Sequence, residues 1–419
     1  MKLTRYKLGE ILNVTRGASL SGEFYATEGE YIRLTCGNFD YQNNCFKENK
    51  SKDNLYYVGD FRSEFLMEEG DIITPLTEQA IGLLGSTAII PESGKYIQSQ
   101  DVAKIVCKED LLDKNFAFYL ISSALVKQQL SAAAQQTKIR HTSPDKIKDC
   151  TVWIPELSEQ KRIGKLLRSI DSKIELNRQI NQNLEAMAKQ LYDYWFVQFD
   201  FPNEEGKPYK SSGGKMVWNE KLKREIPQGW NNGMLIDIAN ITMGQSPDGS
   251  SYNEVGEGML FYQGSTDFGM RFPSVRQYTT APSRYAKRGD ILMSVRAPVG
   301  SINIANNDCC IGRGLSAINS KLRSTTHLYY ILNDLRIAFE QRNAAGTTFG
   351  SITKEDLYSL PIIIPSHEVI RAFDKICSPM FDRQMILGEE IDNLIKQRDG
   401  LLPLLMNGQV SVNSDLSDD

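Results

Sequence analysis

The sequence has little of the chemistry that metal sites, disulfides and membrane spans require. Its three histidines lie far apart, and its seven cysteines include no CxxC spacing. These counts argue against a zinc finger and favour a reducing compartment. No stretch approaches the roughly 18 apolar residues of a membrane span, and the first residues, MKLTRYKLGEIL, contain no apolar signal-peptide core. We therefore expect a cytoplasmic protein without a membrane segment.

Motifs for catalysis are also missing. The sequence contains no GxxxxGK[ST] or GxGxxG nucleotide loop, no HExxH or GxSxG, and no Asn-Pro-Pro-aromatic motif for amino methylation of a base. The segment SGGKM (212–216) ends in Lys-Met and lacks the leading glycine of a phosphate loop. We expect a chain that recognises a partner and catalyses no reaction itself, with no metal or cofactor of its own.

The net charge of −4 excludes a generally basic nucleic-acid binder, so a DNA-binding surface would have to be a local patch. The length of 419 residues allows two to three domains. Residues 1–155 carry thirteen lysines and five arginines, whereas 229–365 carry three lysines and nine arginines. Because arginine presents a planar fork and lysine a point charge, this difference is compatible with different recognition chemistry in the two segments.

The sequence contains an internal repeat. VWIPELSEQKRI (152–163) reappears as IIIPSHEVIRAF (362–373), and further pairs keep the same order along the chain. These are LGEILNVTRG (8–17) with LIDIANITMG (235–244), GDIITP (70–75) with GDILMS (289–294), and QSQDVAKI (98–105) with IGRGLSAI (311–318). Two long copies are too few for a solenoid, so a duplicated pair of domains is the simpler interpretation.

Each copy mixes strands and helices. Short alternating apolar stretches punctuated by Gly, Pro, Asn and Ser predict strands, and the spacing in 114–130 and 326–341 predicts helices. After each Ile-Pro the pattern becomes one long helix with a heptad stripe. We call the stripe of residues through which such a helix would contact its partner the seam. The predicted seam residues are Ile163, Leu167, Ile170, Ile174, Asn177, Asn181, Leu184, Leu191, Phe373, Met380, Leu387, Ile391, Leu394 and Leu401.

Two matched long helices favour pairing with each other, although each stripe could instead pack on its own domain. Residues 202–230 are rich in Gly, Ser, Lys and Pro and predict a linker that lets the chain reverse, which makes an antiparallel pair the natural arrangement. Asn177 and Asn181 have the character of register-setting seam residues. Pro379 is expected to kink the second helix or delay its start.

Several motifs together resemble the DNA-specificity subunit of type I restriction-modification enzymes over essentially the whole chain. They are IPELSEQKRIGKLLRSIDSKIELNRQINQNLEAMAKQLYDYWFVQFDFP (154–202), GKPYKSSGGKMVWNEKLKREIPQGW (206–230), KRGDILMSVRAPVGSINIANNDCCIGRGLSAI (287–318) and the two Ile-Pro boundaries. The second boundary, IPSHEVI, departs from the pattern because no Gln follows Glu368.

The resemblance implies an α+β fold with an internal pseudo-twofold repeat. Two similar mixed α/β target-recognition domains would be joined to two long helices that form an antiparallel coiled coil. We expect the following parts: target-recognition domain 1 at 1–155, the first long helix at 156–200, a linker at 201–228, target-recognition domain 2 at 229–365, the second long helix at 366–407, and a disordered acidic tail at 408–419.

The resemblance also implies partners. Each domain would read one half of a split, asymmetric site in double-stranded DNA, the long helices would dock two methyltransferase subunits, and motor-nuclease restriction subunits would join that core. S-adenosylmethionine, ATP and magnesium would be used by those other chains. Two other classes stay open at this point: a catalytic methyltransferase or nuclease with degenerate motifs, and a coiled-coil scaffold without a DNA role.

Candidate DNA-reading residues are long polar side chains in loops between strands, since Arg suits guanine and Asn or Gln suits adenine in the major groove. They are Arg33, Asn38, Lys47, Lys50, Lys52, Gln79, Gln100, Lys138 and Arg140 in the first copy, and Gln263, Arg271, Arg276, Arg296, Arg313 and Thr348 in the second. Any one of them could equally be a surface side chain or a phosphate contact.

Overall fold

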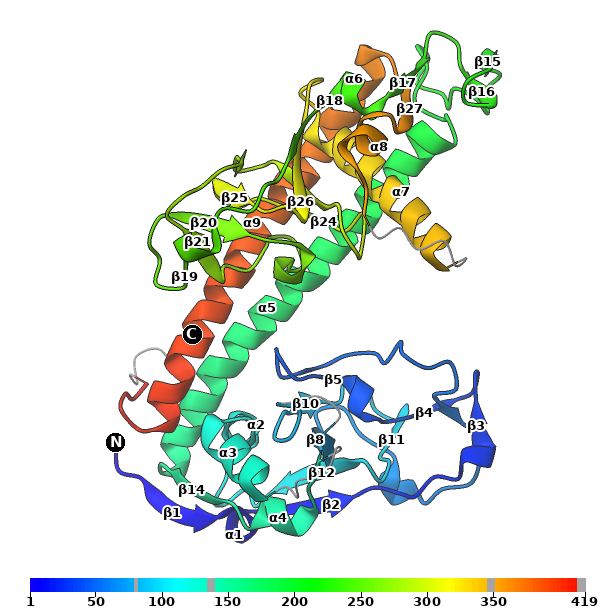
Figure 1. Cartoon of the computed structure of the whole chain (residues 1–419). Coiled ribbons are helices and arrows are strands. Elements are labelled where there is room, and N and C mark those ends of the chain that lie inside the picture. The colour runs from blue at the N-terminus through cyan, green and yellow to red at the C-terminus, as the bar shows by residue number, and fades with distance from the viewer. Residues whose placement is uncertain (79–81, 134–139, 345–350, 413–419) are drawn as a thin grey trace. The chain divides into compact units, whose positions relative to one another are not determined.

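The computed structural model describes residues 1–78, 82–133, 140–344 and 351–412. The chain divides into two compact units, Met1–Ile174 with Asn393–Asp419, and Glu175–Asp392. Each unit combines one α/β domain with a stretch of two long helices, α5 (Leu157–Tyr192) and α9 (His367–Met406), which are drawn in green and red-orange in Figure 1. None of the helices in the described ranges is long and apolar enough to cross a membrane.

The domain of the first unit contains two small four-stranded sheets. The first has the order β10 (Ala88–Ile89), β8 (Ile72–Pro75), β12 (Val102–Cys107), β2 (Leu12–Arg16), and the second β11 (Tyr96–Ile97), β4 (Tyr31–Arg33), β7 (Tyr56–Tyr57), β3 (Tyr25–Ala26). Short pairs join β5 (Phe39–Asp40) to β6 (Cys45–Phe46) and β9 (Thr77–Glu78) to β13 (Arg140–His141). The helices are α1 (Leu8–Ile11), α2 (Lys114–Ile121), α3 (Ala124–Ala133) and α4 (Pro144–Lys148).

The domain of the second unit repeats this order of elements. Its first sheet runs β18 (Ala239–Met243), β26 (Leu315–Ser320), β23 (Ile291–Ser294), β24 (Ile302–Ile304), and its second β19 (Tyr252–Asn253), β21 (Gln277–Thr279), β20 (Met259–Tyr262), β25 (Cys309–Ile311), β22 (Tyr285–Ala286). Helices α6 (Leu235–Ile238), α7 (Thr325–Ala344) and α8 (Lys354–Tyr358) follow the same sequence order. The parallel pair β4–β11 corresponds to β20–β25. The expected α+β fold with an internal repeat is therefore confirmed.

The doubled Ile-Pro boundary closes each domain. β1 (Thr4–Lys7) pairs antiparallel with β14 (Thr151–Ile154), and β17 (Asn231–Met234) pairs in the same way with β27 (Pro361–Ile364). The last strand of each domain ends at the isoleucine that precedes the proline, and a long helix begins two residues after that proline. The proline lacks an N–H for the ladder and disfavours helix in the preceding residue, so it separates strand from helix at the same place in both copies.

In the first unit, α5 and α9 pack against each other and against the domain. Ile163 and Leu167 share one apolar core with Leu405 and Met406. The Arg398 guanidinium donates to the Asp171 carboxylate at 2.9 Å.

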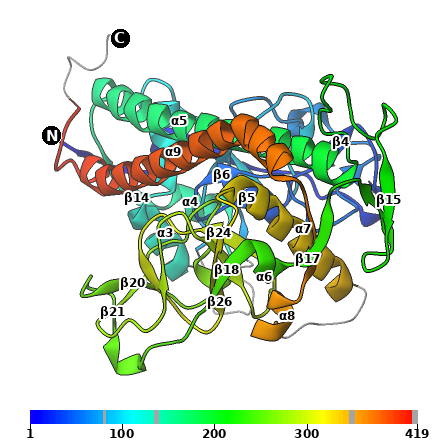
Figure 2. The same cartoon turned by 90° about the horizontal axis from the view of Figure 1, so that it is seen from above.

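In the second unit the two helices pack in the same antiparallel sense. The Gln384 amide donates to the main-chain oxygen of Asn181 at 3.3 Å, and Tyr192 lies 6.2 Å from Phe373 between ring centroids. In each unit the α9 partner number falls as the α5 number rises. The helices lie side by side in both views (Figure 2), so the antiparallel pair is confirmed.

Every predicted seam residue is at least half-buried. Buried members are Ile163, Leu167, Ile174, Asn177, Asn181, Phe373, Leu387 and Ile391, and half-buried ones are Ile170, Leu184, Leu191, Met380, Leu394 and Leu401. A second series on α9, with its members seven residues apart, is buried at all six positions: Ile370, Cys377, Gln384, Ile391, Arg398 and Leu405. The inner face of α9 is thus mostly apolar, with Gln384 and Arg398 as its polar members.

Pro379 does not delay the start of the second helix. Helix α9 begins at His367 and continues through Pro379 to Met406. A proline inside a helix costs about 3 kcal/mol because a backbone hydrogen bond is lost. Burial of Phe373, Cys377 and Phe381 around it anchors the helix on both sides of the proline.

The range predicted as a linker is more ordered than its composition indicates. After α5 comes a π-helical turn, Asp193–Val197, and then a hairpin of β15 (Met216–Asn219) and β16 (Arg224–Pro227). Phe201 stacks on Tyr209 at 4.6 Å and on Trp230 at 5.0 Å between ring centroids. These aromatic contacts fix the segment on the second unit.

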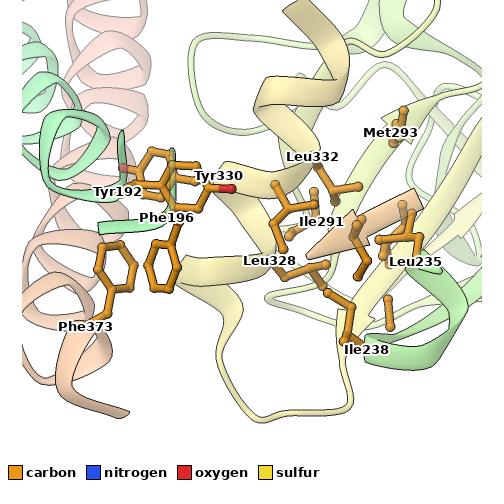
Figure 3. Close-up of a cluster of buried hydrophobic side chains, with 14 of the residues drawn as sticks. Tyr192, Phe196, Leu235, Ile238, Ile291, Met293, Leu328, Tyr330, Leu332 and Phe373 are labelled. Atoms are coloured by element: carbon orange, nitrogen blue, oxygen red, sulfur yellow. The ribbon is translucent and has the colours of Figure 1, made fainter. Parts of the chain in front are cut away.

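The core of the second unit joins both helices to the domain (Figure 3). Tyr192, Phe196 and Phe373 of the helical part group together with Tyr330 of α7, and Leu328 of α7 lies among the apolar side chains of the domain. His327 is also enclosed, with its ring 4.6 Å from that of Phe196. Burial lowers the pKa of His327 from 6.5 to about 3.

The buried His327 makes the second unit sensitive to acid. Between pH 6.5 and about 3 the unfolded state binds a proton at this residue and the folded state does not, so stability falls as the pH falls. We expect a loss of about 2 kcal/mol in the free energy of unfolding between pH 7 and 5 from this residue. In urea titrations, His327→Leu should flatten the pH dependence, whereas His367→Leu, at an exposed position, should not. Equal slopes for wild type and His327→Leu would contradict this.

The buried polar residue Asn181 in the seam should lower the free energy of unfolding. Neither side-chain amide atom of the buried Asn181 has a hydrogen-bond partner in the described part of the chain. Leaving such groups unsatisfied costs about 1–3 kcal/mol. Asn181→Leu should therefore raise the free energy of unfolding by about 1 kcal/mol, measured by denaturant titration, while Asn183→Leu on the exposed face should leave it nearly unchanged. A destabilised Asn181→Leu variant would show that this asparagine contributes stability.

Candidate DNA interface

In the first domain, a turn after β4 organises the candidate residues. Asn38 is 2% exposed; its side-chain oxygen accepts from the Thr35 N–H at 2.9 Å, and its amide donates to the Lys47 carbonyl at 3.3 Å. Arg33 is also buried, lies 3.8 Å above the Tyr25 ring, and donates to the Asn54 carbonyl. Both side chains hold loops together and expose almost no surface to a base.

The loop held by Asn38 carries three exposed lysines. Lys47, Lys50 and Lys52 all lie at the surface. Lys50 and Lys52 line a hollow of about 280 Å³ together with Lys95, a residue that the loop pattern alone had not selected. Glu48 and Asp53 line the same hollow, and Lys95 pairs with Glu92 at 2.9 Å, so the hollow itself carries little net charge. The exposed Lys47, Lys50 and Lys52 are the local cations that this loop offers to phosphate.

The remaining candidates of the first copy lie on neighbouring loops. The Cys36 thiol donates to the Thr77 carbonyl at 3.3 Å, which brings the β9–β13 pair next to the turn. Burial, and after it the charge of Asp101, raises the pKa of Cys36 to about 11, so the thiol keeps its proton. Arg140 on β13 lies 3.6 Å from Glu78, and Gln100 is exposed. Gln79 and Lys138 lie outside the described residues.

The second domain groups its candidates around the equivalent turn after β20. The Gln263 amide donates to the Ser246 hydroxyl at 2.9 Å, and the Arg313 N–H donates to the same hydroxyl at 3.2 Å. Arg276 forms an ion pair with the buried Asp267, whose carboxylate also accepts from the Gln263 N–H. The structure therefore brings Gln263, Arg276 and Arg313 together.

Arg271 belongs to a different part of the second unit. It is 8% exposed, with its guanidinium 5.1 Å from the Tyr329 ring centroid and 4.5 Å from that of Phe381. It also pairs with Glu185 of α5 at 3.3 Å. The side chain thus ties the domain to the helices.

Two further candidates lie at the edge of this group or beyond it. Arg296 is exposed, and its backbone forms a bridge with Ser351. Thr348 lies outside the described residues. Arg284, which was not among the candidates, is exposed, and its carbonyl accepts from the Ile311 N–H two residues before Arg313. Its position in a loop between short strands is the signal that could have identified it.

Within the ranges that the structure describes, no three His, Cys, Asp or Glu side chains gather in a way that could hold a metal ion. The two domains present matching turns. Each turn is fixed by an Asn or Asp side chain, and exposed cationic and amide groups surround it. Such groups bind phosphates and base edges. The fold defines a duplicated protein built on an antiparallel helix pair, and these surfaces have the chemistry that suits recognition of DNA.

Comparison with known proteins gives the family. The family model described as "Type I restriction modification DNA specificity domain" matches residues 2–186 and 227–397, once for each copy of the repeat. The chain belongs to this family and is a specificity subunit of type I restriction-modification systems.

Several relatives are named as specificity subunits of type I restriction enzymes. A type I restriction enzyme MjaX specificity subunit of Methanocaldococcus jannaschii is 30% identical over 379 residues, which cover 86% of this chain and 84% of the relative. The HindI specificity subunit of Haemophilus influenzae is 24% identical over 377 residues, covering 76% and 81%. A solved S subunit from M. genitalium superimposes with a TM-score of 0.63 at 16% identity, covering 97% of this chain and 96% of that one, and so shares the fold.

Exposed and buried arginines should differ in their effect on DNA binding. Each phosphate contact adds about −0.9 to the slope of log affinity against log salt. If Arg313 contacts phosphate, Arg313→Ala will weaken binding and reduce that slope by about 0.9, measured by fluorescence anisotropy on the chain assembled with the other subunits of its restriction-modification system. Arg33→Met, the buried control, should leave the slope unchanged. A base contact by Arg313 would instead relax specificity at one position, and no change in either quantity would remove Arg313 from the interface.

Proposed function

We propose that each domain reads one half of a split, asymmetric site in double-stranded DNA and that the helix pair fixes the spacing between the halves. Two methyltransferase subunits dock on this chain, and restriction subunits join them. S-adenosylmethionine, ATP and magnesium serve those partners, while this chain catalyses no step. Because the DNA that it recognises is cellular, we place the chain in the cytoplasm.

One observation carries this proposal: the two domains share their topology but differ in the groups around the equivalent turn. The first turn is fixed by the neutral Asn38 and flanked by lysines, and the second is fixed by Asp267, which pairs with Arg276. A symmetric dimer reads two equal half-sites. A duplicated single chain keeps the pseudo-twofold framework and lets the half-sites differ.

The helix pair is suited to a spacer because its alignment is specified by partly buried polar contacts. Asn177 donates to Glu390 at 3.0 Å, and Arg398 donates to Asp171 at 2.9 Å. Sliding one helix along the other would break both contacts and separate the Arg398–Asp171 ion pair. The register is therefore strongly favoured over its neighbours.

Exposed apolar side chains on the helices support docking of partner helices. On α5, Leu176 is 60% and Met187 54% exposed, with the half-buried Ile180 between them. On α9, Ile386 is 55% exposed. These positions lie outside the buried seam, and apolar residues repeated at helical spacing on an outer face suit a second layer of helices.

The two reading functions should be separable along the sequence. Replacing residues 229–365 with the corresponding segment of a relative that has a different target should change one half of the methylated motif and leave the other half intact. Replacing 1–155 should do the converse. Methylome sequencing of cells that carry each chimaera measures both halves at once. If one replacement changed both half-sites, the domains would read DNA jointly.

A further inference from the structure

The first domain contains a hollow that none of the candidate DNA residues lines. It measures about 540 Å³ and lies among β4, β7 and the loop that follows β7. Its walls include the rings of Tyr31, Tyr57 and Phe61, with Val58 and Leu66 beside them. We refer to it as the Tyr31 hollow.

The aromatic wall is tightly built. The Tyr31 and Phe61 ring centroids lie 5.1 Å apart at an interplanar angle of 77°, and Phe24 packs edge-on against Tyr57 at 6.0 Å. Gly59 makes this possible, because a Cβ there would lie 2.6 Å from the Phe24 ring. The rings therefore have neighbours that fix their orientation before any ligand arrives.

Two carboxylates, Glu30 and Asp60, complete the lining. Both residues are exposed, and neither forms an ion pair with a cation of the described chain. The two nearby arginines are engaged elsewhere: Arg33 lies over the Tyr25 ring, and Arg62 pairs with Glu64 at 2.9 Å and lies over Phe65. Three aromatic residues and two carboxylates thus line the hollow, and no cationic residue of the described chain is among its lining residues.

We propose that the Tyr31 hollow binds an arginine or lysine side chain of a protein partner. Aromatic faces attract guanidinium and ammonium groups through the ring quadrupole, and nearby carboxylates add charge attraction. The same carboxylates repel phosphate, so a cationic protein segment fits this site better than DNA does.

The site is specific to the first copy. On the equivalent strands of the second domain, Met259 pairs with Thr279 where Tyr31 pairs with Tyr57 in the first. The second domain therefore lacks these two rings. The partner contact would distinguish the two otherwise similar domains, which goes beyond the proposed reading of DNA and does not depend on it.

Methyl NMR spectra of the full chain test this directly, because Val58 and Leu66 report from inside the hollow. The probes are N-acetyl-arginine amide, N-acetyl-lysine amide and the neutral N-acetyl-glutamine amide. We expect saturable shifts of these methyl signals with the two cationic probes only. The doubly neutralised variant Glu30→Gln with Asp60→Asn should bind at least about fivefold more weakly, and Phe61→Leu about two- to fivefold more weakly.

Matched controls lie on the same loop. Glu68→Gln with Glu69→Gln changes the same charge outside the hollow, and Phe65→Leu removes a ring that does not line it. Both should bind the probes like the wild type. Equal weakening by the controls, or equal shifts with the glutamine probe, would overturn the proposal. So would spermidine binding more tightly than acetylated triarginine amide, which indicates a polyamine site, or duplex DNA moving the same methyl signals.

Discussion

The fold depends on the antiparallel contact between α5 and α9, because each domain completes its core with residues from both helices. Within each unit this contact centres on one half-buried carboxylate. Asp171 accepts from Tyr119 of the domain and from Arg398 of α9, and Glu185 accepts from Arg271, Tyr330 and Gln384. These donors offset the partial desolvation of each carboxylate, so the domain, α5 and α9 are held together at one point.

This arrangement explains why the largely apolar seam of the helix pair contains two long polar side chains on α9. Gln384 and Arg398 occupy inner positions because they are donors to the two carboxylates. Apolar side chains at these positions would leave Asp171 and Glu185 with fewer hydrogen-bond donors. These polar residues lower the stability of the helix pair but favour one defined register. A spacer between two DNA-reading domains requires such a register.

Much of this architecture could be predicted from the sequence, because the repeat, the Ile-Pro boundaries and the heptads are local patterns. The burial of Arg33, Asn38 and Arg271 could not. Arg271 and Arg313 look alike in sequence, yet one lies between the rings of Tyr329 and Phe381 and the other is exposed, and only tertiary packing distinguishes them. The ordered structure of residues 202–230 could not be predicted for a similar reason. The aromatic residues there show no helical or strand periodicity, and they gain partners only in the folded chain, where Trp230 stacks on Phe201.

The spacer role of the helix pair is the central claim, and its most direct test is an insertion at the boundary between the two units. Four residues added after Ile174 and four added before Asn393 preserve the contacts within each unit. Each insertion lengthens its helix by about 6 Å and turns it by about 40°. A base pair adds about 3.4 Å and 36° to DNA, so methylome sequencing should find both half-sites unchanged and the spacer one or two base pairs longer. An unchanged spacer with methylation retained, or altered half-sites, would contradict the account.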